Sequence, residues 1–369
     1  MAQPGWATAE GTARYRRRFE GKIPEGHFRK QQDLWHSSIG LGTYLGNHDA
    51  VADESYRQAV VRAVELGCNV IDSAINYRFQ RSERAIGAAL KELPAGGFER
   101  NEIIIATKGG FLPFDGAPPR DMRGYFVETF VKPGIAAVAD LVQGCHCMTP
   151  AYLLNQLDCS RRNLGIECID IYYVHNPETQ LAEVSRDEFN ERLRKAFEAL
   201  EGAVAAGKIR MYGTATWNAY RNNPEAKDYL SLAELVELAK QAGGAEHHFR
   251  AIQLPFNLGM AEALTKRNQR VAGEPLSTLD AAEALGLTVM CSASILQGQL
   301  SRNLPPFVGE ALSGLETDAQ RSLQFVRSTP GVTTALVGMK QTRHVEENLK
   351  VAQLAPAAAE QYGKLFSEA

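Results

Sequence analysis

The chain has 369 residues, of which 44% are hydrophobic and 22% are charged, and its net charge is −3. These are the proportions of an ordinary globular protein, long enough to bury a large core without disulfides or a structural metal. The small net charge gives no reason to expect nucleic acid or an anionic membrane surface as a partner. No stretch approaches the roughly 18 apolar residues of a membrane span, so we expect no membrane association.

Cysteine usage and the N-terminal segment both favour a cytoplasmic location. Six cysteines occur, and Cys68 and Cys291 lie in or beside apolar runs, as reduced core thiols do. The opening segment, "MAQPGWATAEGTARYRRRFEG", lacks the apolar region of a secretion signal. Because free thiols persist mainly in reducing compartments, we expect a cytoplasmic protein. The sequence leaves the oligomeric state open.

Eight short apolar runs predict buried parallel strands, each followed by a helical pattern. The runs are 37–42, 69–74, 103–107, 169–174, 209–215, 251–256, 287–293 and 334–339. The clearest helical patterns are 53–67, 82–93 and 189–209. Alternating strands and helices imply a parallel sheet with right-handed crossovers, and eight such units predict a closed (β/α)8 TIM barrel. Residues 37–369 are therefore predicted to form a single barrel domain.

Two segments depart from this even spacing. Residues 1–36 precede the first strand and form an N-terminal extension, either a tail or a hairpin that closes the bottom of the barrel. The second is a long insertion after the third strand, with one obvious helix at 149–165. The rest of the insertion, 109–150, is rich in Gly, Pro and aromatic residues, and an insertion at this end of a barrel strand lies over the active-site face.

Aromatic side chains in the insertion have two interpretations. Phe111, Phe114, Tyr125 and Phe126 would give a substrate large contact area at low entropic cost if they lined the mouth of a pocket. Alternatively, they only anchor the insertion to the barrel. The sequence does not decide between these two roles.

Four polar residues follow apolar runs and carry the functional signal. Asp72 ends "CNVID", with Tyr77 five residues later; Lys108 ends "EIIIATK", and His175 ends "CIDIYYVH". Because barrels build active sites at the carboxyl ends of their strands, we expect these four side chains to meet. Each taken alone has a structural explanation, such as a helix cap for Asp72. Their joint order favours catalysis.

Together these groups suit the reduction of a carbonyl. A phenol has a pKa of about 10, and an adjacent ammonium would lower it by stabilising the phenolate. A carboxylate would hold that ammonium in place and charged, and an imidazole would hydrogen-bond the substrate oxygen. Since no protein side chain supplies a hydride, a cofactor must provide the electrons.

The motifs around these residues resemble the aldo-keto reductases over nearly the whole chain, from about Gly40 to Asn348. "IDSAINY…SERAIGAAL" is similar to that family's segment D-x-A-x-x-Y-G-x-S-E-x-x-[IL]-G-x-A-L, although Arg78 replaces the glycine and two residues are added before Ser82. The resemblance implies an NADPH-dependent oxidoreductase that reduces an aldehyde or ketone. It implies Tyr77 as general acid, tuned by Asp72 and Lys108, and His175 as the group that orients the carbonyl.

The same resemblance implies a set of cofactor-binding residues. "KIRMYGTATWN" and "AIQLPFN" would contact the nicotinamide amide, "SASILQGQL" the pyrophosphate, and "VGMKQTRHVEEN" the adenosine end. Ala215 replaces the family's usual serine, and Ser292 stands where an aromatic residue often stacks on the nicotinamide. The implied residues are Ala215, Thr216, Gln253, Ser292, Ala293, Ile295, Gly298, Gly338, Lys340, His344, Glu347 and Asn348.

Basic residues near the last of these segments favour NADPH over NADH. Lys340, Arg343 and His344 cluster where a helix is expected to begin, near Thr342. Cations are disfavoured at a helix N-terminus unless an anion is bound there. The 2′-phosphate of NADPH would be that anion, with Lys340 as its principal contact; the alternative is a solvated basic turn.

The sequence offers three other interpretations. Cys145, His146 and Cys147 have a metal-like composition but not the spacing of common zinc sites, so no metal is expected. A metal-dependent barrel hydrolase is disfavoured because no H-x-H follows the first strand. A nicotinamide-binding regulatory or sensor protein with little turnover stays open, since potassium-channel β-subunits resemble the same family.

Overall fold

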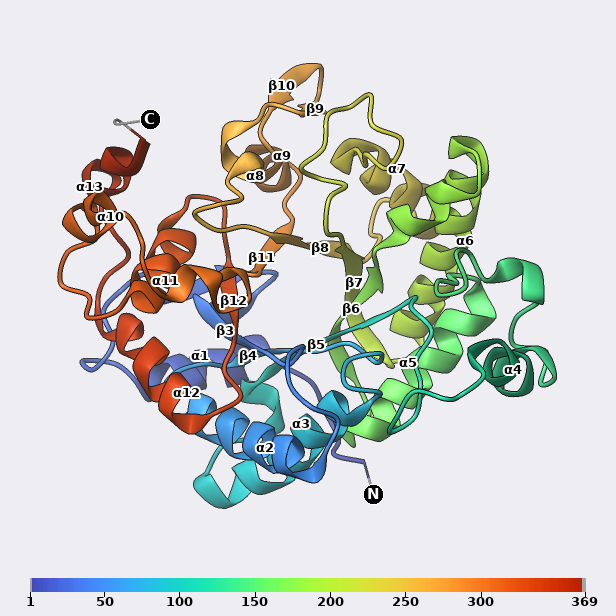
Figure 1. The fold of residues 1–369 in the computed structure, drawn as a ribbon, viewed down its shortest axis with the longest axis horizontal. Coiled ribbons are helices and arrows are strands. Elements are labelled where there is room, and N and C mark those ends of the chain that lie inside the picture. The colour runs from blue at the N-terminus through green and yellow to red at the C-terminus, as the bar shows by residue number, and fades with distance from the viewer. Residues whose placement is uncertain (1, 367–369) are drawn as a thin grey trace.

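A closed barrel of eight parallel strands forms the centre of the computed structural model, which describes residues 2–366, and helices surround it (Figure 1). The barrel strands are β3 (Ile39–Gly42), β4 (Val70–Asp72), β5 (Ile104–Gly109), β6 (Ile169–His175), β7 (Ile209–Ala215), β8 (Phe249–Pro255), β11 (Thr288–Ser292) and β12 (Thr334–Gly338). The predicted (β/α)8 TIM barrel is confirmed, and each predicted apolar run overlaps its strand.

Parallel pairing closes the sheet between its first and last strands. β12 pairs with β3 from Ala335 opposite Ile39 to Gly338 opposite Gly42, and β11 pairs with both β12 and β8. Apolar side chains fill the interior of the barrel as one buried cluster that includes Val70, Ile104, Ala106, Ile171, Tyr173, Met211, Ala251, Met290 and Leu336. The interior is thus a packed core and not a channel.

Amphipathic helices cover the outside of the barrel. The helices are α1 (Ala9–Arg17), α2 (Ala50–Glu65), α3 (Arg81–Glu92), α4 (Met122–Phe126), α5 (Pro150–Leu164), α6 (Arg186–Ala205), α7 (Leu232–Gly243), α8 (Glu262–Thr265), α9 (Thr278–Ala284), α10 (Pro306–Ala311), α11 (Asp318–Ser328), α12 (Thr342–Leu349) and α13 (Ala359–Gly363). α5 ends at Gly165, whose φ of +66° is the left-handed conformation that a helix C-cap requires. Within residues 2–366, none of these helices combines the length and apolar character needed to cross a bilayer.

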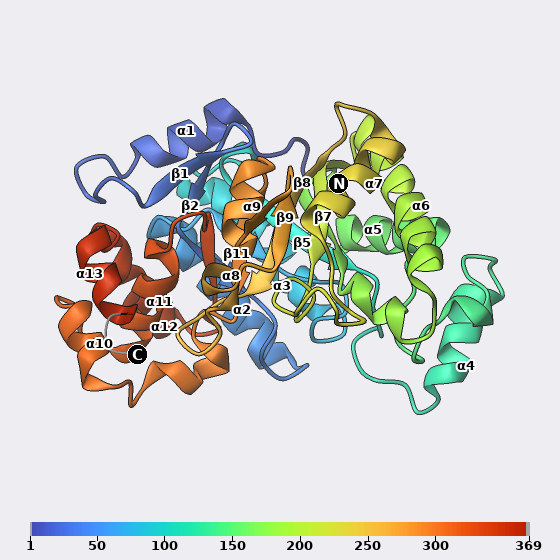
Figure 2. The ribbon, with the colours of Figure 1, turned by 90° about the horizontal axis from the view of Figure 1, so that it is seen from above.

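Residues before β3 pack across the amino-terminal ends of the strands. β1 (Phe28–Gln31) and β2 (Leu34–Ser37) form an antiparallel hairpin, and Asn69, just before β4, bonds the backbone of both Trp35 and Ser37. α1 and this hairpin lie on the opposite side of the barrel from α4 and α10 (Figure 2). The division into an extension, 1–36, and a barrel domain, 37–369, stays a prediction.

The insertion between β5 and α5 has a small core of its own. It ends at the expected helix α5 and contains the short helix α4, which continues into a π-helical turn, Val127–Val131. The buried residues of this core are Leu112, Phe126, Phe130, Cys147 and Tyr152. This cluster, to which Tyr152 of α5 contributes, is separate from the barrel core, and the insertion stands out from the barrel at α4 (Figure 2).

A short hairpin interrupts the connection from β8 to β11. Its strands are β9 (Gln269–Val271) and β10 (Glu274–Leu276), and they pair only with each other.

Candidate active site

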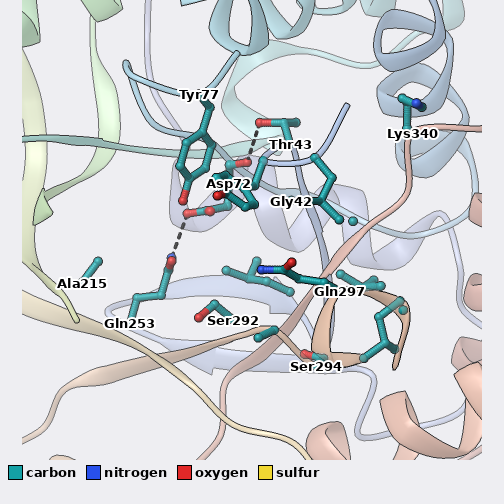
Figure 3. Close-up of a pocket in the computed structure, with 18 of the residues that line it drawn as sticks. Gly42, Thr43, Asp72, Tyr77, Ala215, Gln253, Ser292, Ser294, Gln297 and Lys340 are labelled. Atoms are coloured by element: carbon teal, nitrogen blue, oxygen red, sulfur yellow. Dashed lines mark hydrogen bonds between the residues drawn. The ribbon is translucent and has the colours of Figure 1, made fainter. Parts of the chain in front are cut away.

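A cavity of about 810 Å³ opens at the carboxyl ends of the barrel strands. Residues from the ends of seven barrel strands, or from the loops directly after them, line it: Gly42, Asp72, His175, Ala215, Gln253, Ser292 and Gly338. Figure 3 shows Tyr77, Asp72 and Gln253 gathered in one part of this cavity, with Lys340 well away from Tyr77. The arrangement follows from the parallel barrel, which brings every strand end to one face.

Asp72 and Lys108 form a buried ion pair at the floor of the cavity. The Lys108 Nζ donates to Asp72 Oδ2 at 2.6 Å and to the Ser73 carbonyl at 2.6 Å. Asp72 Oδ1 accepts from Gln253 Nε2 at 2.8 Å. Lys108 is 1% exposed and lies behind the cavity wall, whereas Asp72 and Gln253 both line the cavity. Each charge therefore has fixed partners.

Tyr77 and His175 complete the predicted set of four. Their rings meet edge to face with centroids 5.8 Å apart, and the Lys108 Nζ lies 5.1 Å from the centre of the Tyr77 ring. Both side chains line the cavity. The structure thus brings together all four residues that the sequence singled out.

Burial controls the protonation of this group of residues. Burial raises the pKa of Asp72 against the opposing effects of Lys108 and Gln253, and it lowers the pKa of Lys108 against the opposing effect of Asp72. Since each charge stabilises the other, the two are charged together. Burial, with Lys108 and His146 adding to it, lowers the pKa of His175 well below its usual value, so His175 is neutral near pH 7.

The pKa of Tyr77 is raised and not lowered as the sequence led us to expect. Burial first, then the charge of Asp72 and the neighbouring Tyr44, raise the pKa of Tyr77 well above its usual value. The ammonium of Lys108 lies over the ring and is bonded to Asp72, so it is not directed at the hydroxyl. Tyr77 therefore keeps its proton at neutral pH.

All twelve residues implied as cofactor ligands line the cavity. Three buried polar atoms of lining residues lack a hydrogen-bond partner among the described residues: Asn76 Oδ1, His175 Nδ1 and Thr216 Oγ1. At Gly338 and Gly298 a Cβ would meet little or nothing, so a ligand has room to approach the backbone there. These unpaired polar atoms and open backbone positions fit a large polar ligand such as a nicotinamide dinucleotide.

The basic cluster at the start of α12 divides into two groups. Lys340 and His344 line the cavity, whereas Arg343 is exposed and does not. Within the described part of the chain, Lys340 forms no ion pair with a carboxylate. Of the three residues, Lys340 therefore has both the position and the charge to contact an anion in the cavity.

Arg78 occupies the position where the family motif has glycine. Arg78, Phe79 and Gln80 have φ values of +48°, +57° and +69°, in the left-handed region that favours glycine. The Arg78 side chain is buried, bonds the Asn47 carbonyl at 2.7 Å and pairs with Asp53. The strained turn thus directs a guanidinium against the loop after β3, which lines the cavity.

Several lining residues were not predicted from the sequence. Thr43, Tyr44 and Trp217 directly follow β3 and β7, so the strand-end rule that identified Asp72 would have found them. Ala319 reaches the cavity from α11, and nothing in the sequence indicates this.

Aromatic residues of the insertion divide between the two roles considered above. Phe111 lines the cavity and packs edge to face on His175, with ring centroids 5.0 Å apart. Phe126 is buried in the insertion core, and Phe114 and Tyr125 pack at its edge. Only Phe111 therefore reaches the pocket.

Polar side chains gathered at the carboxyl ends of a closed parallel barrel are the arrangement in which α/β barrels build their active sites. More narrowly, the chain belongs to the aldo/keto reductase family, whose sequence pattern matches residues 38–243. No group of His, Cys, Asp and Glu side chains within residues 2–366 is arranged to hold a metal ion.

Individual relatives are distant. The chain is 29% identical over 203 residues to the NADP(+)-linked aldo-keto reductase yakc of Schizosaccharomyces pombe, covering 54% of this chain and 48% of the relative. It is 29% identical over 219 residues to the NADH-specific methylglyoxal reductase of Escherichia coli, covering 58% and 56%. The matches thus span about half the length of these two relatives.

Longer matches are weaker in identity. A putative voltage-gated potassium channel subunit beta of Schizosaccharomyces pombe is 22% identical over 347 residues, covering 91% of this chain and 90% of the relative. The aldo-keto reductase AKR11C1 of Bacillus halodurans superposes with a TM-score of 0.63 at 20% identity, covering 92% of this chain and 95% of the other. This structural likeness supports the fold alone.

Proposed function

We propose that this protein reduces an aldehyde or ketone to an alcohol, with NADPH as the hydride donor. The observation that carries the proposal is the meeting of Tyr77, His175 and the buried Asp72–Lys108 pair in one part of a large cavity. When bound, NADPH would supply the hydride that no side chain can provide.

The chain's own residues supply the proton and the orientation. The substrate oxygen would lie between the Tyr77 hydroxyl and the neutral His175 imidazole, and Tyr77 would donate its proton to that oxygen. The Asp72–Lys108 pair and Gln253 hold the floor of the site, and Tyr44, Phe111 and Trp217 line its wall. The reverse oxidation would use the same groups.

The proposed cofactor ligands are the twelve lining residues implied by the family resemblance. Ala215, Thr216 and Gln253 lie beside the four-residue group, which is where the reacting nicotinamide has to be, and Lys340 lies far from it. Cytoplasmic localisation remains part of the proposal, supported by six cysteines that are all unpaired.

Following NADPH absorbance against a panel of sugars, aromatic aldehydes, quinones and open-chain ketones tests the proposal. Consumption of NADPH that depends on both the carbonyl and Tyr77 would support it. Tight NADPH binding without turnover on any carbonyl would instead favour the regulatory or sensor alternative. The similarity to a putative potassium channel subunit supports this alternative.

Lys340→Ala should separate NADPH from NADH. A charge-assisted contact to the 2′-phosphate contributes about 1.5–3 kcal/mol, so NADPH binding should weaken roughly 10- to 100-fold while NADH binding changes little. Fluorescence titration of both cofactors measures this difference. Arg343→Ala is the matched control, because Arg343 is exposed and outside the cavity. Equal losses for both cofactors would rule out the phosphate contact.

Phe111→Ala should raise KM or change substrate preference, because Phe111 forms part of the pocket wall beside His175. Phe126→Ala is the paired variant: loss of a fully buried phenyl group costs about 3–5 kcal/mol of stability. Steady-state kinetics should therefore reveal the effect of Phe111→Ala, and thermal melting should reveal the effect of Phe126→Ala. If Phe111→Ala destabilised the protein as much as Phe126→Ala and left KM unchanged, Phe111 would be only an anchor.

A further inference from the structure

His146, in the Cys145–Cys147 segment of the insertion, is fully buried and directly behind the candidate active site. Its Nε2 lies 2.8 Å from the His175 carbonyl oxygen, and its Nδ1 lies 2.9 Å from Gln180 Nε2. His175 is the last residue of β6, and Gln180 lies in the turn that follows this strand, Pro177–Ala182. The imidazole therefore connects the insertion to the strand end that carries His175.

Hydrogen-bond chemistry fixes the direction of this connection. The Arg192 guanidinium on α6 can only donate, and its Nη1 lies 2.6 Å from Gln180 Oε1. The Gln180 amide nitrogen must then face His146, where its two hydrogens reach Nδ1 and, at 3.1 Å, the His146 carbonyl oxygen. Because Nδ1 accepts, Nε2 carries the proton and donates to the His175 carbonyl. Burial also lowers the pKa of His146 to about 4, in agreement with a neutral ring.

His146 also fixes the residues that face the substrate. A Cβ at Gly110, in the loop after β5, would lie 2.8 Å from His146 Nε2, so the ring packs directly on that backbone. The Phe111 ring meets both imidazoles edge to face, at 5.2 Å from His146 and 5.0 Å from His175. Asn176, next to His175, has a φ of +44°, a turn that needs outside support.

We propose that His146 is a positioning residue for carbonyl reduction. Through its bond to the His175 backbone and its contact with Phe111, it holds the imidazole and the pocket wall in their reactive arrangement, and Arg192 and Gln180 set its tautomer. The proposal rests on the proposed function for its kinetic consequence, but the hydrogen-bond relay can be tested without turnover.

Steady-state kinetics of His146→Leu should show a 10- to 100-fold loss in kcat, in the range that small misplacements of reacting groups produce. NADPH affinity should change less than threefold, and KM should change less than kcat. His146→Gln keeps an amide N–H near the position of Nε2 and should recover most of the kcat. An unchanged kcat in His146→Leu, or no recovery in His146→Gln, would overturn the proposal.

His27→Leu is the matched control, because His27 is equally buried and its Nε2 also bonds a backbone carbonyl, that of Gly67, at 2.9 Å. It precedes β1, on the far side of the barrel from the cavity. Its replacement should lower stability but leave kcat within twofold of the wild type. An equal loss of kcat in both leucine variants would overturn the proposal, because it would mean that His146 only supports the fold.

Nitrogen-15 NMR of the wild-type protein labelled at histidine tests the relay independently of activity. The His146 ring should be protonated on Nε2 alone at pH 7 and should not titrate between pH 8 and 5, and Gln180→Leu should change its resonances. A ring protonated on Nδ1, or one that titrates near pH 6.5, would overturn the relay. Failure of the wild type to reduce any carbonyl would instead count against the proposed function. It would not affect the NMR result on the hydrogen bonds of His146.

Discussion

Tyr77→Phe should lower the turnover of carbonyl reduction at least about 10²-fold, the size expected for the loss of a general acid. The substitution removes one hydroxyl and keeps the ring that packs on His175 and Tyr44, so folding and NADPH affinity should barely change. Steady-state kinetics and a cofactor titration measure the two effects. If Tyr77→Phe turned over at the wild-type rate, Tyr77 would not be the general acid.

The direction of the Tyr77 pKa adds a pH dependence to this prediction. Because burial and Asp72 hold that pKa well above 10, the hydroxyl stays protonated across the neutral range. The rate of reduction should therefore be nearly flat from pH 6 to 9, since His175 is neutral there as well. The rate of alcohol oxidation, which needs the phenolate, should rise with pH. A fall in the reduction rate centred near pH 7 would contradict this assignment.

Lys108→Met should cost both stability and turnover. It leaves the Asp72 carboxylate buried with Gln253 as its remaining side-chain partner, and breaking a buried pair in this way costs about 3–5 kcal/mol. Denaturant titration measures the loss of stability. Without Lys108 the pKa of Asp72 rises further, so the folded state takes up a proton more readily than the unfolded chain. The variant should consequently regain stability as the pH falls from 8 to 5.

The double variant Asp72→Asn with Lys108→Met separates these two effects. It removes both charges, so it should recover most of the lost stability. Turnover should remain low, because the charged pair beside Tyr77 is still missing. Recovery of turnover together with stability would mean that the pair supports the fold and has no part in the chemistry.

The strands and the location of the cavity were predictable because the physics that forms them is local. A run such as the one ending at Asp72 is apolar on both faces, as only a strand buried on both sides can be, and the barrel then brings every strand end to one face. The side-chain directions at those ends were not predictable. The Lys108 ammonium bonds Asp72 and the Ser73 carbonyl, and spacing along the chain contains no information about that choice.

The insertion was the least predictable part of the chain. α4 has five residues and continues into a π-helical turn, so it is too short to show a helical period. His146 acts through contacts with Gln180 and His175, which are distant in sequence. The spacing of its neighbours Cys145 and Cys147 argued against a metal site but gave no indication of the hydrogen bonds that the imidazole makes.

The separate core of the insertion has a consequence for how the protein responds to heat. Leu112, Phe126 and Phe130 pack mainly within the insertion, so this segment can open as a local cooperative unit at a lower free energy than global unfolding. Phe111 would then leave the cavity wall, and His146 would leave its place behind that wall, while the barrel stayed folded. Thermal inactivation would then precede the melting of the barrel, and amide hydrogen exchange would be faster in the insertion than in the barrel strands.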